Sequence, residues 1–163
     1  MGLHRKGVGM EREMRRKERK VSVEKAWEML ETAEWGVLSL ASAGGEPYGV
    51  PLNYACQGKC LYIHCAIEGK KIDIIKENDK ASFCCVVSAK AMPAKFTTAY
   101  ASAIAKGKVE IASDEDKRKA LRLLIEKYCA GLEKEGLEYT EKLYGITEVI
   151  KFSVESVSGK SNI

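Results

Sequence analysis

The chain between Tyr48 and Lys71 constrains the fold most strongly, because it combines two strand patterns, a tight turn and the start of a helix. Alternating large and small side chains predict one strand over 48–54, and a second strand pattern follows over 60–65. Gln57–Lys59 holds a glycine between two polar residues, which is typical of a tight turn that reverses the chain. The stretch therefore predicts an antiparallel hairpin around which the other strands are arranged.

The two faces of the first predicted strand differ in bulk. The larger side chains share one face by the two-residue period of a strand, and they are Tyr48, Val50, Leu52 and Tyr54. The other face carries Gly49, Pro51 and Asn53, small or flat residues over which a planar ligand could approach the backbone. Proline has no N–H group to offer a neighbouring strand, so Pro51 favours an edge strand or a bulge.

Two lysines open the helix that is predicted after the second strand. Glu68–Gly69 is a turn signal, and three isoleucines follow with the spacing of a short buried helix. Lys70 and Lys71 then lie in the first turn, where the helix dipole disfavours a cation by up to about 1 kcal/mol. A bound anion would reverse this cost, because free backbone N–H groups and two ammonium groups would converge on it. Two lysines that simply point into solvent are the alternative.

Further strands and helices flank this region. Apolar patterns predict strands over 36–41, 81–87, 96–112 and 146–155, with a loop over 88–95. Capping residues and amphipathic spacing predict helices over 22–30, 113–128 and 131–144. The run over 81–87 is almost continuously apolar, which predicts a strand buried on both faces. Six or seven strands joined mostly by hairpins favour a small antiparallel barrel over a doubly wound parallel sheet.

The strand predicted over 96–112 has one polar face and one face of small apolar residues. Thr98, Tyr100 and Ser102 alternate with three alanines. Polar side chains on one face of an otherwise buried strand indicate either solvent or a ligand. Both alternatives stay open from the pattern alone.

Positive charge is concentrated at the start of the chain. Residues 1–20 hold eight lysines and arginines against three glutamates, whereas the rest of the 163 residues hold 19 basic and 20 acidic side chains. We therefore predict a basic arm over 1–20, flexible at its start, and a single neutral domain over 21–163. Such a domain lacks the basic surface typical of nucleic-acid binding, although the arm could contact a polyanion. Met14 is an alternative start of translation.

Composition and cysteine spacing exclude several classes of protein. A content of 45% apolar and 31% charged residues is typical of a soluble folded chain. No apolar run approaches the roughly 20 residues that span a bilayer, and no signal peptide is visible, so we expect a cytoplasmic protein. Among the six cysteines, Cys56 and Cys60 have no second closely spaced pair to complete a zinc site. We therefore expect buried thiols and no metal.

Common nucleotide-binding and hydrolytic motifs are missing. The sequence has no glycine-rich dinucleotide loop and no phosphate-binding P-loop. Its only histidines are His4, in the basic arm, and His64, so a Ser-His-Asp triad is not credible. His64 shares a strand face with Tyr62 and is a candidate for proton transfer near neutral pH. A histidine that only hydrogen-bonds across the sheet is the structural alternative.

Five segments carry a family resemblance, in order along the chain. They are MRRKERKV from Met14, PYGVPLNY over 47–54, LYIHCAIEGKKID over 61–73, TTAYASAIAKGKV over 97–109 and VIKFSVESVSGK over 149–160. Together they resemble the nitroimidazole-resistance (Nim) proteins of the pyridoxamine-phosphate-oxidase-like superfamily. The His-x-Ala-x-x-Gly-Lys-Lys pattern that begins at His64 is the most specific part of this resemblance.

The resemblance implies a mostly β fold with flanking helices, namely a six-stranded antiparallel split β-barrel, and a homodimer with FMN at the interface. Lys70 and Lys71 would hold the FMN phosphate, and His64 would lie close to the flavin. The implied cofactor contacts are Val50, Pro51, Leu52, Asn53, Tyr54, Ile63, His64, Lys70, Lys71, Thr98, Tyr100 and Ser102. Ala99 stands where the pattern often has arginine, which removes a positive charge near the ligand.

An FMN-dependent oxidoreductase is the function that this resemblance implies, with electrons passing to a nitro group or another small oxidised acceptor and His64 as the catalytic group. The alternative is a non-catalytic split-barrel binder of FMN, haem or a deazaflavin that acts as a carrier or sensor. A ligand-free interaction module with a polyanion-binding arm is a third possibility. The expected partners are a second copy of the chain, with the Tyr62 and His64 face in or near the interface, and a small-molecule acceptor.

Overall fold

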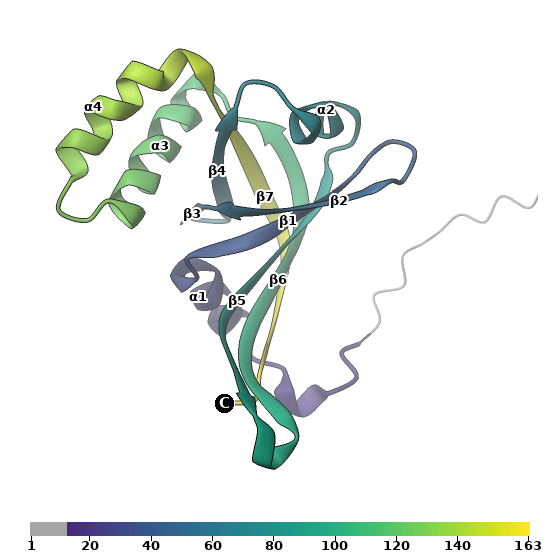
Figure 1. Ribbon diagram of the computed structural model, residues 1–163. Coiled ribbons are helices and arrows are strands. Elements are labelled where there is room, and N and C mark those ends of the chain that lie inside the picture. The colour runs from purple at the N-terminus through teal and green to yellow at the C-terminus, as the bar shows by residue number, and fades with distance from the viewer. Residues whose placement is uncertain (1–12) are drawn as a thin grey trace, which may run out of the picture.

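Seven antiparallel strands form one sheet with four α-helices packed against it or against one another in the computed structural model, which describes residues 13–163 (Figure 1). The strands are β1 (Trp35–Ala41), β2 (Pro47–Asn53), β3 (Ala55–Gln57), β4 (Cys60–Ala66), β5 (Lys80–Met92), β6 (Thr97–Ile111) and β7 (Thr147–Ser161). The helices are α1 (Val23–Thr32), α2 (Lys70–Glu77), α3 (Asp114–Tyr128) and α4 (Glu133–Leu143). The first twelve residues of the predicted basic arm, including His4, lie outside the described residues.

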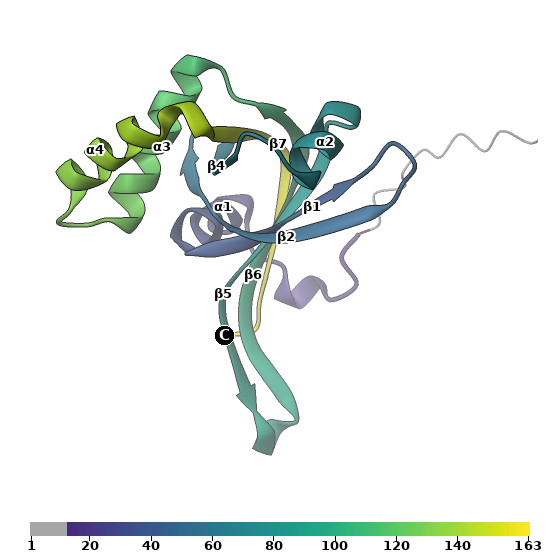
Figure 2. The same cartoon turned by 45° about the horizontal axis from the view of Figure 1, so that its top comes forward.

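The sheet curls so strongly that its two end strands follow one another in the chain. Its order is β2-β1-β5-β6-β7-β4-β3, yet only Tyr54 separates β2 from β3 in sequence. A flat sheet of seven strands would place its ends roughly 29 Å apart at about 4.8 Å per strand, so one residue could not join them. The mostly antiparallel, split-barrel-like fold is therefore confirmed, with seven strands instead of the predicted six (Figure 2).

The hairpin predicted over 48–65 is wrong in its pairing. β2 pairs with β1, from Pro47 opposite Ala41 to Asn53 opposite Trp35. The tight turn at Gln57–Lys59 instead joins the three-residue β3 to β4. The first strand of that hairpin ends at Asn53, and the short β3 begins at Ala55, after Tyr54, whose side chain is fully buried.

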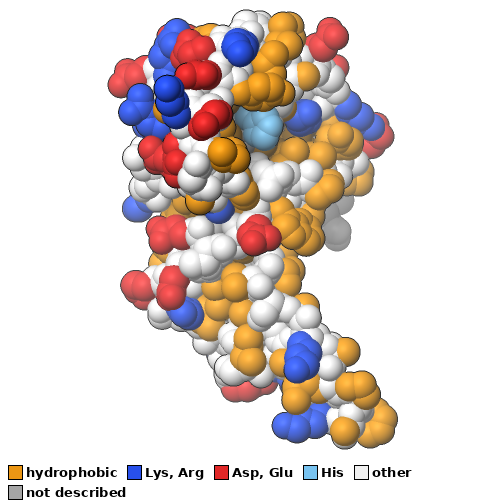
Figure 3. Space-filling view, turned by 60° about the vertical axis from the view of Figure 1, so that its left-hand side comes forward, with side chains coloured by type: hydrophobic (Ala, Val, Ile, Leu, Met, Phe, Trp, Pro, Cys, Tyr) orange, Lys and Arg blue, Asp and Glu red, His pale blue; other side chains and the backbone are white. Residues whose placement is uncertain are grey.

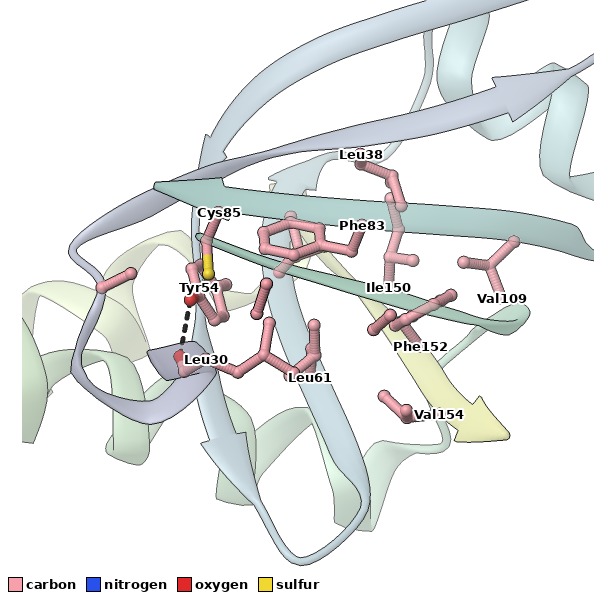
Figure 4. Packing of buried hydrophobic residues seen from close by; sticks show 14 of the residues in the cluster. Leu30, Leu38, Tyr54, Leu61, Phe83, Cys85, Val109, Ile150, Phe152 and Val154 are labelled. Atoms are coloured by element: carbon pink, nitrogen blue, oxygen red, sulfur yellow. Dashed lines mark hydrogen bonds between the residues drawn. The ribbon is translucent and has the colours of Figure 1, made fainter. Parts of the chain in front are cut away.

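The core explains why Tyr54 turns inward. Its ring packs edge-to-face against Phe83 with 4.5 Å between ring centres, and its hydroxyl donates a hydrogen bond of 2.5 Å to the Leu30 carbonyl (Figure 4). Leu61 and Phe152 are buried in the same cluster, as the alternation along β4 and β7 predicts. The three isoleucines of α2 are also buried, which confirms the predicted face of that helix.

α3 covers the outside of β4 and removes Tyr62 from the surface. Apolar residues of α3 pack against Tyr62, which is almost fully buried. Asp116 fastens α3 to β7, because its carboxylate accepts a hydrogen bond from Lys151 Nζ at 2.7 Å, and it also accepts one from Lys119 Nζ of the same helix at 2.6 Å. These two bonds lower the pKa of Asp116 to about 2. The Tyr62 side chain is therefore covered by α3 of its own chain, and the interface predicted in or near the Tyr62 and His64 face stays a prediction.

β5 and β6 extend beyond the rest of the sheet as a two-stranded ribbon (Figure 1). β5 has no β1 neighbour after Cys85, and β6 pairs with β7 only as far as Ala101. We call residues 88–100 of this ribbon the arm, which is a different segment from the basic arm predicted over 1–20. The loop predicted over 88–95 is wrong, because β5 continues to Met92 and only Pro93–Lys95 forms a 3₁₀ turn.

The end of β5 is also more exposed than its apolar sequence suggests. Val86 and Val87 are both more than two-fifths exposed, so the prediction of a strand buried on both faces is wrong for this part. The physical reason is the loss of β1 as a neighbour after Cys85.

The last residues of the predicted basic arm lie along β7. Lys20 forms a bridge with Lys160, and the Val21 N–H donates to the Gly159 carbonyl at 3.2 Å. All six cysteine thiols are free. Within residues 13–163, no helix has the length and apolar character needed to cross a membrane.

Candidate functional site

The lysine pair lies at the start of α2, as predicted. The helix begins at Lys70 after Gly69, whose φ of 129° is a conformation that glycine adopts readily. No side chain caps this end, and the N–H groups of Lys70 and Lys71 have no hydrogen-bond partner within the described part of the chain. Free N–H groups beside two ammonium groups form an anion-binding arrangement.

The two lysines have different surroundings. Lys70 Nζ lies 3.3 Å from Glu46 Oε1 and 5.3 Å from the centre of the Tyr48 ring. Lys71 makes no ion pair in residues 13–163, so its charge is the one that remains available to a ligand. The Glu46 contact could not be predicted from a local pattern, because 24 residues separate Glu46 from Lys70.

His64 is exposed on β4, opposite Val149 of β7. Figure 3 shows it in pale blue between apolar side chains and a group of lysines or arginines. Partial burial lowers its pKa, and the nearby charge of Lys71 lowers the pKa further. The neutral imidazole is therefore the main form at pH 7, with one ring nitrogen carrying a proton. β3 pairs with β4 only as far as Tyr62, so His64 stands where β4 has an open edge.

Replacing Lys71 by alanine should raise the pKa of His64, because the change removes one of the two causes that lower it. The matched Lys70→Ala change should move this pKa less, since Glu46 already compensates the Lys70 charge. An NMR titration of the imidazole C–H signals would measure both variants. Equal shifts would contradict Lys71 as the uncompensated cation beside His64.

β2 presents the predicted face of small residues. Gly49, Pro51 and Asn53 are exposed, whereas Val50 and Leu52 are half-buried and pack against the core. β2 ends the sheet, so its second edge has no neighbouring strand in the described structure and Pro51 lies on an edge strand as predicted. The small-residue face and the open edge leave this backbone accessible.

Two of the predicted flavin contacts lie in the core instead. The side chains of Tyr54 and Ile63 are fully buried. Tyr128 holds the Tyr54 backbone, because its hydroxyl accepts from the Tyr54 N–H at 3.1 Å and its one proton lies between the carbonyls of Glu34 at 2.5 Å and Tyr54 at 2.8 Å. The side chains of Tyr54 and Ile63 therefore belong to the core, and a contact of these two residues with a flavin stays a prediction that could involve only their backbone.

The polar residues of β6 lie far from His64. They are Thr98, Tyr100 and Ser102. On β7, His64 pairs with Val149, whereas Ser102 pairs with Lys160, eleven positions further along the same strand. At about 3.3 Å per residue, roughly 36 Å of strand separates the two groups. One chain therefore does not bring all the predicted contacts together.

Two surface hollows in the described structure contain none of the predicted site residues. One, of about 570 Å³, lies between residues 18–21, α1 and the base of the arm. The other, of about 480 Å³, lies between the end of α2 and β6. The lysines and His64 are thus on an open surface.

The curled sheet with its open edges and outer helices defines a split-barrel-like protein. A family model described as pyridoxamine 5′-phosphate oxidase matches residues 22–161. The chain belongs to this family, which confirms the superfamily that the sequence resembles. No curated protein matches the chain.

Solved structures show the same fold at low identity. A candidate 5-nitroimidazole antibiotic resistance protein from Bacteroides thetaiotaomicron is 23% identical with a TM-score of 0.69, over 86% of this chain and 85% of that one. An FAD-binding protein from Mesorhizobium loti is also 23% identical, with a TM-score of 0.62 over 86% of this chain and 93% of that one. An FAD- and haem-binding protein from Mycobacterium smegmatis is 20% identical, with a TM-score of 0.74 over 88% of this chain and 73% of that one.

Proposed function

We propose that this protein is a flavoprotein that binds FMN and passes electrons to a small oxidised acceptor. The observation that carries the proposal is the uncapped start of α2, where the Lys71 ammonium and two free N–H groups stand beside His64. The family of the chain and the FAD-binding neighbours support a flavin as the ligand.

The residues present fit FMN at both of its ends. A phosphate would accept hydrogen bonds from the free N–H groups at the start of α2, in place of the missing cap, and it would compensate the positive charge of Lys71. The exposed face of Gly49, Pro51 and Asn53 offers a flat backbone surface to the ring. Bound FMN would supply hydride or single-electron transfer, and the protein would set access and orientation. His64 would hold the proton that a reduced acceptor needs.

We also propose a homodimer, in which β6 of one copy completes the site at His64 of the other. Roughly 36 Å of strand separates these groups in one chain, so a second copy is the direct way to bring them together. An apolar surface on the outside of the sheet supports this arrangement. Trp35, Val86 and Ile104 are 52%, 45% and 45% exposed on neighbouring strands, and such a surface favours burial against a partner.

The absorption spectrum of the purified protein tests the cofactor, and light scattering tests the dimer. We expect flavin bands, release of FMN on denaturation and the mass of two chains. A haem spectrum would favour the second candidate, a haem carrier, for which the neutral and exposed His64 offers an iron ligand. A colourless protein that takes up neither cofactor, or a flavin-loaded monomer at micromolar concentration, would contradict the proposal.

A further inference from the structure

The tip of the arm carries two cations beside a fully exposed aromatic ring. Phe96 is 97% exposed, and its φ of 48° places it in the left-handed region. A bulky residue held there costs about 1 kcal/mol or more, so the position is strained without any packing in return. Lys90 and Lys95 make no ion pair in residues 13–163, and residues 88–100 contain no acid (Figure 3).

The arm is also short of support from its own chain. Beyond Cys85, β5 has no β1 partner in the described structure, and beyond Ala101 β6 has no β7 partner. Asn162, just after β7, hydrogen-bonds to Tyr100 and Thr98, so the support from the rest of the described chain reaches the base of the arm and not its tip. A two-stranded ribbon alone in water is marginally stable at best. The arm would therefore gain stability from a second surface that covers its tip.

α4 carries four glutamates and two lysines, so its net charge is opposite to that of the arm tip. Glu135, Glu138 and Tyr139 have the i, i+3 and i+4 spacing that places side chains together on a helix. Tyr139 is 64% exposed. Neither glutamate forms an ion pair within the part of the chain that the structure describes. We call these three residues the α4 face. It presents an aromatic ring with two carboxylates, and the arm tip presents an aromatic ring with two ammonium groups, so the two surfaces are complementary.

The tip and the α4 face cannot meet within one chain. Figures 1 and 2 show them at opposite ends of the molecule. β7 begins next to α4 and ends at the base of the arm, and its 15 residues span about 45 Å. A contact between the two surfaces therefore requires two copies of the chain.

We propose that the arm tip of each copy docks on the α4 face of the other copy. Lys90 and Lys95 would pair with Glu135 and Glu138, and Phe96 would pack against Tyr139. Two such contacts close a symmetric dimer, because the same pair of surfaces is used in both directions. The inference rests on the dimer of the proposed function and adds a specific contact that the flavin site does not require.

Charge reversal tests the contact through the choice of partner. One variant carries Lys90→Glu and Lys95→Glu, and the other carries Glu135→Lys and Glu138→Lys. Each variant alone would face like charges in its own dimer, whereas a mixed dimer has opposite charges at both contacts. We expect an equal mixture to give at least about a tenfold excess of the mixed dimer over either homodimer. Native mass spectrometry with one chain isotope-labelled would measure the proportions.

Two outcomes distinguish the docking contact from the dimer itself. Mixing in roughly the random ratio of 1:2:1 would overturn the docking while the dimer stands. A monomeric wild-type protein would overturn both. Lys59→Glu is the control variant, because Lys59 is also exposed and lies outside both surfaces. Mixtures that contain this variant should keep the random ratio of dimers.

Replacing Phe96 by asparagine should weaken the dimer. Asparagine tolerates the left-handed backbone, so the change removes the ring without adding strain. An unchanged dimer would contradict a role for the ring.

Discussion

Replacing Lys71 by alanine should weaken FMN binding about tenfold to hundredfold while leaving riboflavin binding nearly unchanged. A charge-assisted hydrogen bond to phosphate contributes about 1.5–3 kcal/mol, which corresponds to that range of affinity. Lys71 is the uncompensated cation at the start of α2, so the loss should fall on the phosphate end of the ligand. Riboflavin keeps the ring but has no phosphate. Titration of the apoprotein with each flavin, followed by fluorescence, gives both dissociation constants.

The matched control is Lys70→Ala, which should have the smaller effect. Lys70 is already paired with Glu46, so a phosphate gains less from it. Neither change should destabilise the apoprotein, because a cation in the first turn of a helix opposes the helix dipole. If Lys71→Ala weakened FMN and riboflavin equally, or lowered the apoprotein's melting temperature, the phosphate assignment would be wrong.

Local patterns predicted the helices and their ends well, because the signal and the structure lie within a few residues. Ser22 and Ser113 accept hydrogen bonds from Lys25 N and Asp116 N, as expected of capping residues. The turn at Gly69 and the helix that follows were likewise predicted from adjacent residues. The open start of α2 could thus be recognised from sequence, and with it the candidate anion site.

Pairing between strands could not be predicted in the same way. The alternation over 48–54 is real, but it contains no information on the neighbouring strand, and β2 pairs with β1 instead of β4. The apolar run at the end of β5 has the composition of a buried strand, yet its exposure depends on where β1 ends. Burial of Tyr54 depends on Phe83 and on Leu30, which is 24 residues away.

The site is predictable only in part for the same reason. His64 and the lysine pair lie within eight residues, so a sequence motif can hold them together. Thr98 to Ser102 belong to a different strand, and the register on β7 places them far from His64. A sequence pattern that implies one site is therefore compatible with two half-sites on one chain. The separation along β7 is the structural observation that supports the second copy proposed above.

Replacing His64 by alanine should leave FMN binding intact and slow acceptor reduction by about a hundredfold or more, the usual scale for losing an acid–base group. His64 is exposed on the open edge of β4, so its removal leaves the core unchanged. Stopped-flow mixing of reduced protein with a nitroaromatic acceptor would measure the rate, and the flavin spectrum would confirm equal loading.

The pH profile separates proton donation by His64 from a merely structural role. Its pKa is lowered from the ordinary value, so the protonated form increases as the pH falls through that lowered pKa. If the imidazolium donates the proton, the wild-type rate should rise over that interval, whereas the rate of His64→Ala should stay flat. Added imidazole should restore part of the lost rate, because it supplies the same acid in solution. A rate unchanged by the substitution, or a loss with the same pH dependence in both proteins, would leave His64 as a residue that only supports the strand edge.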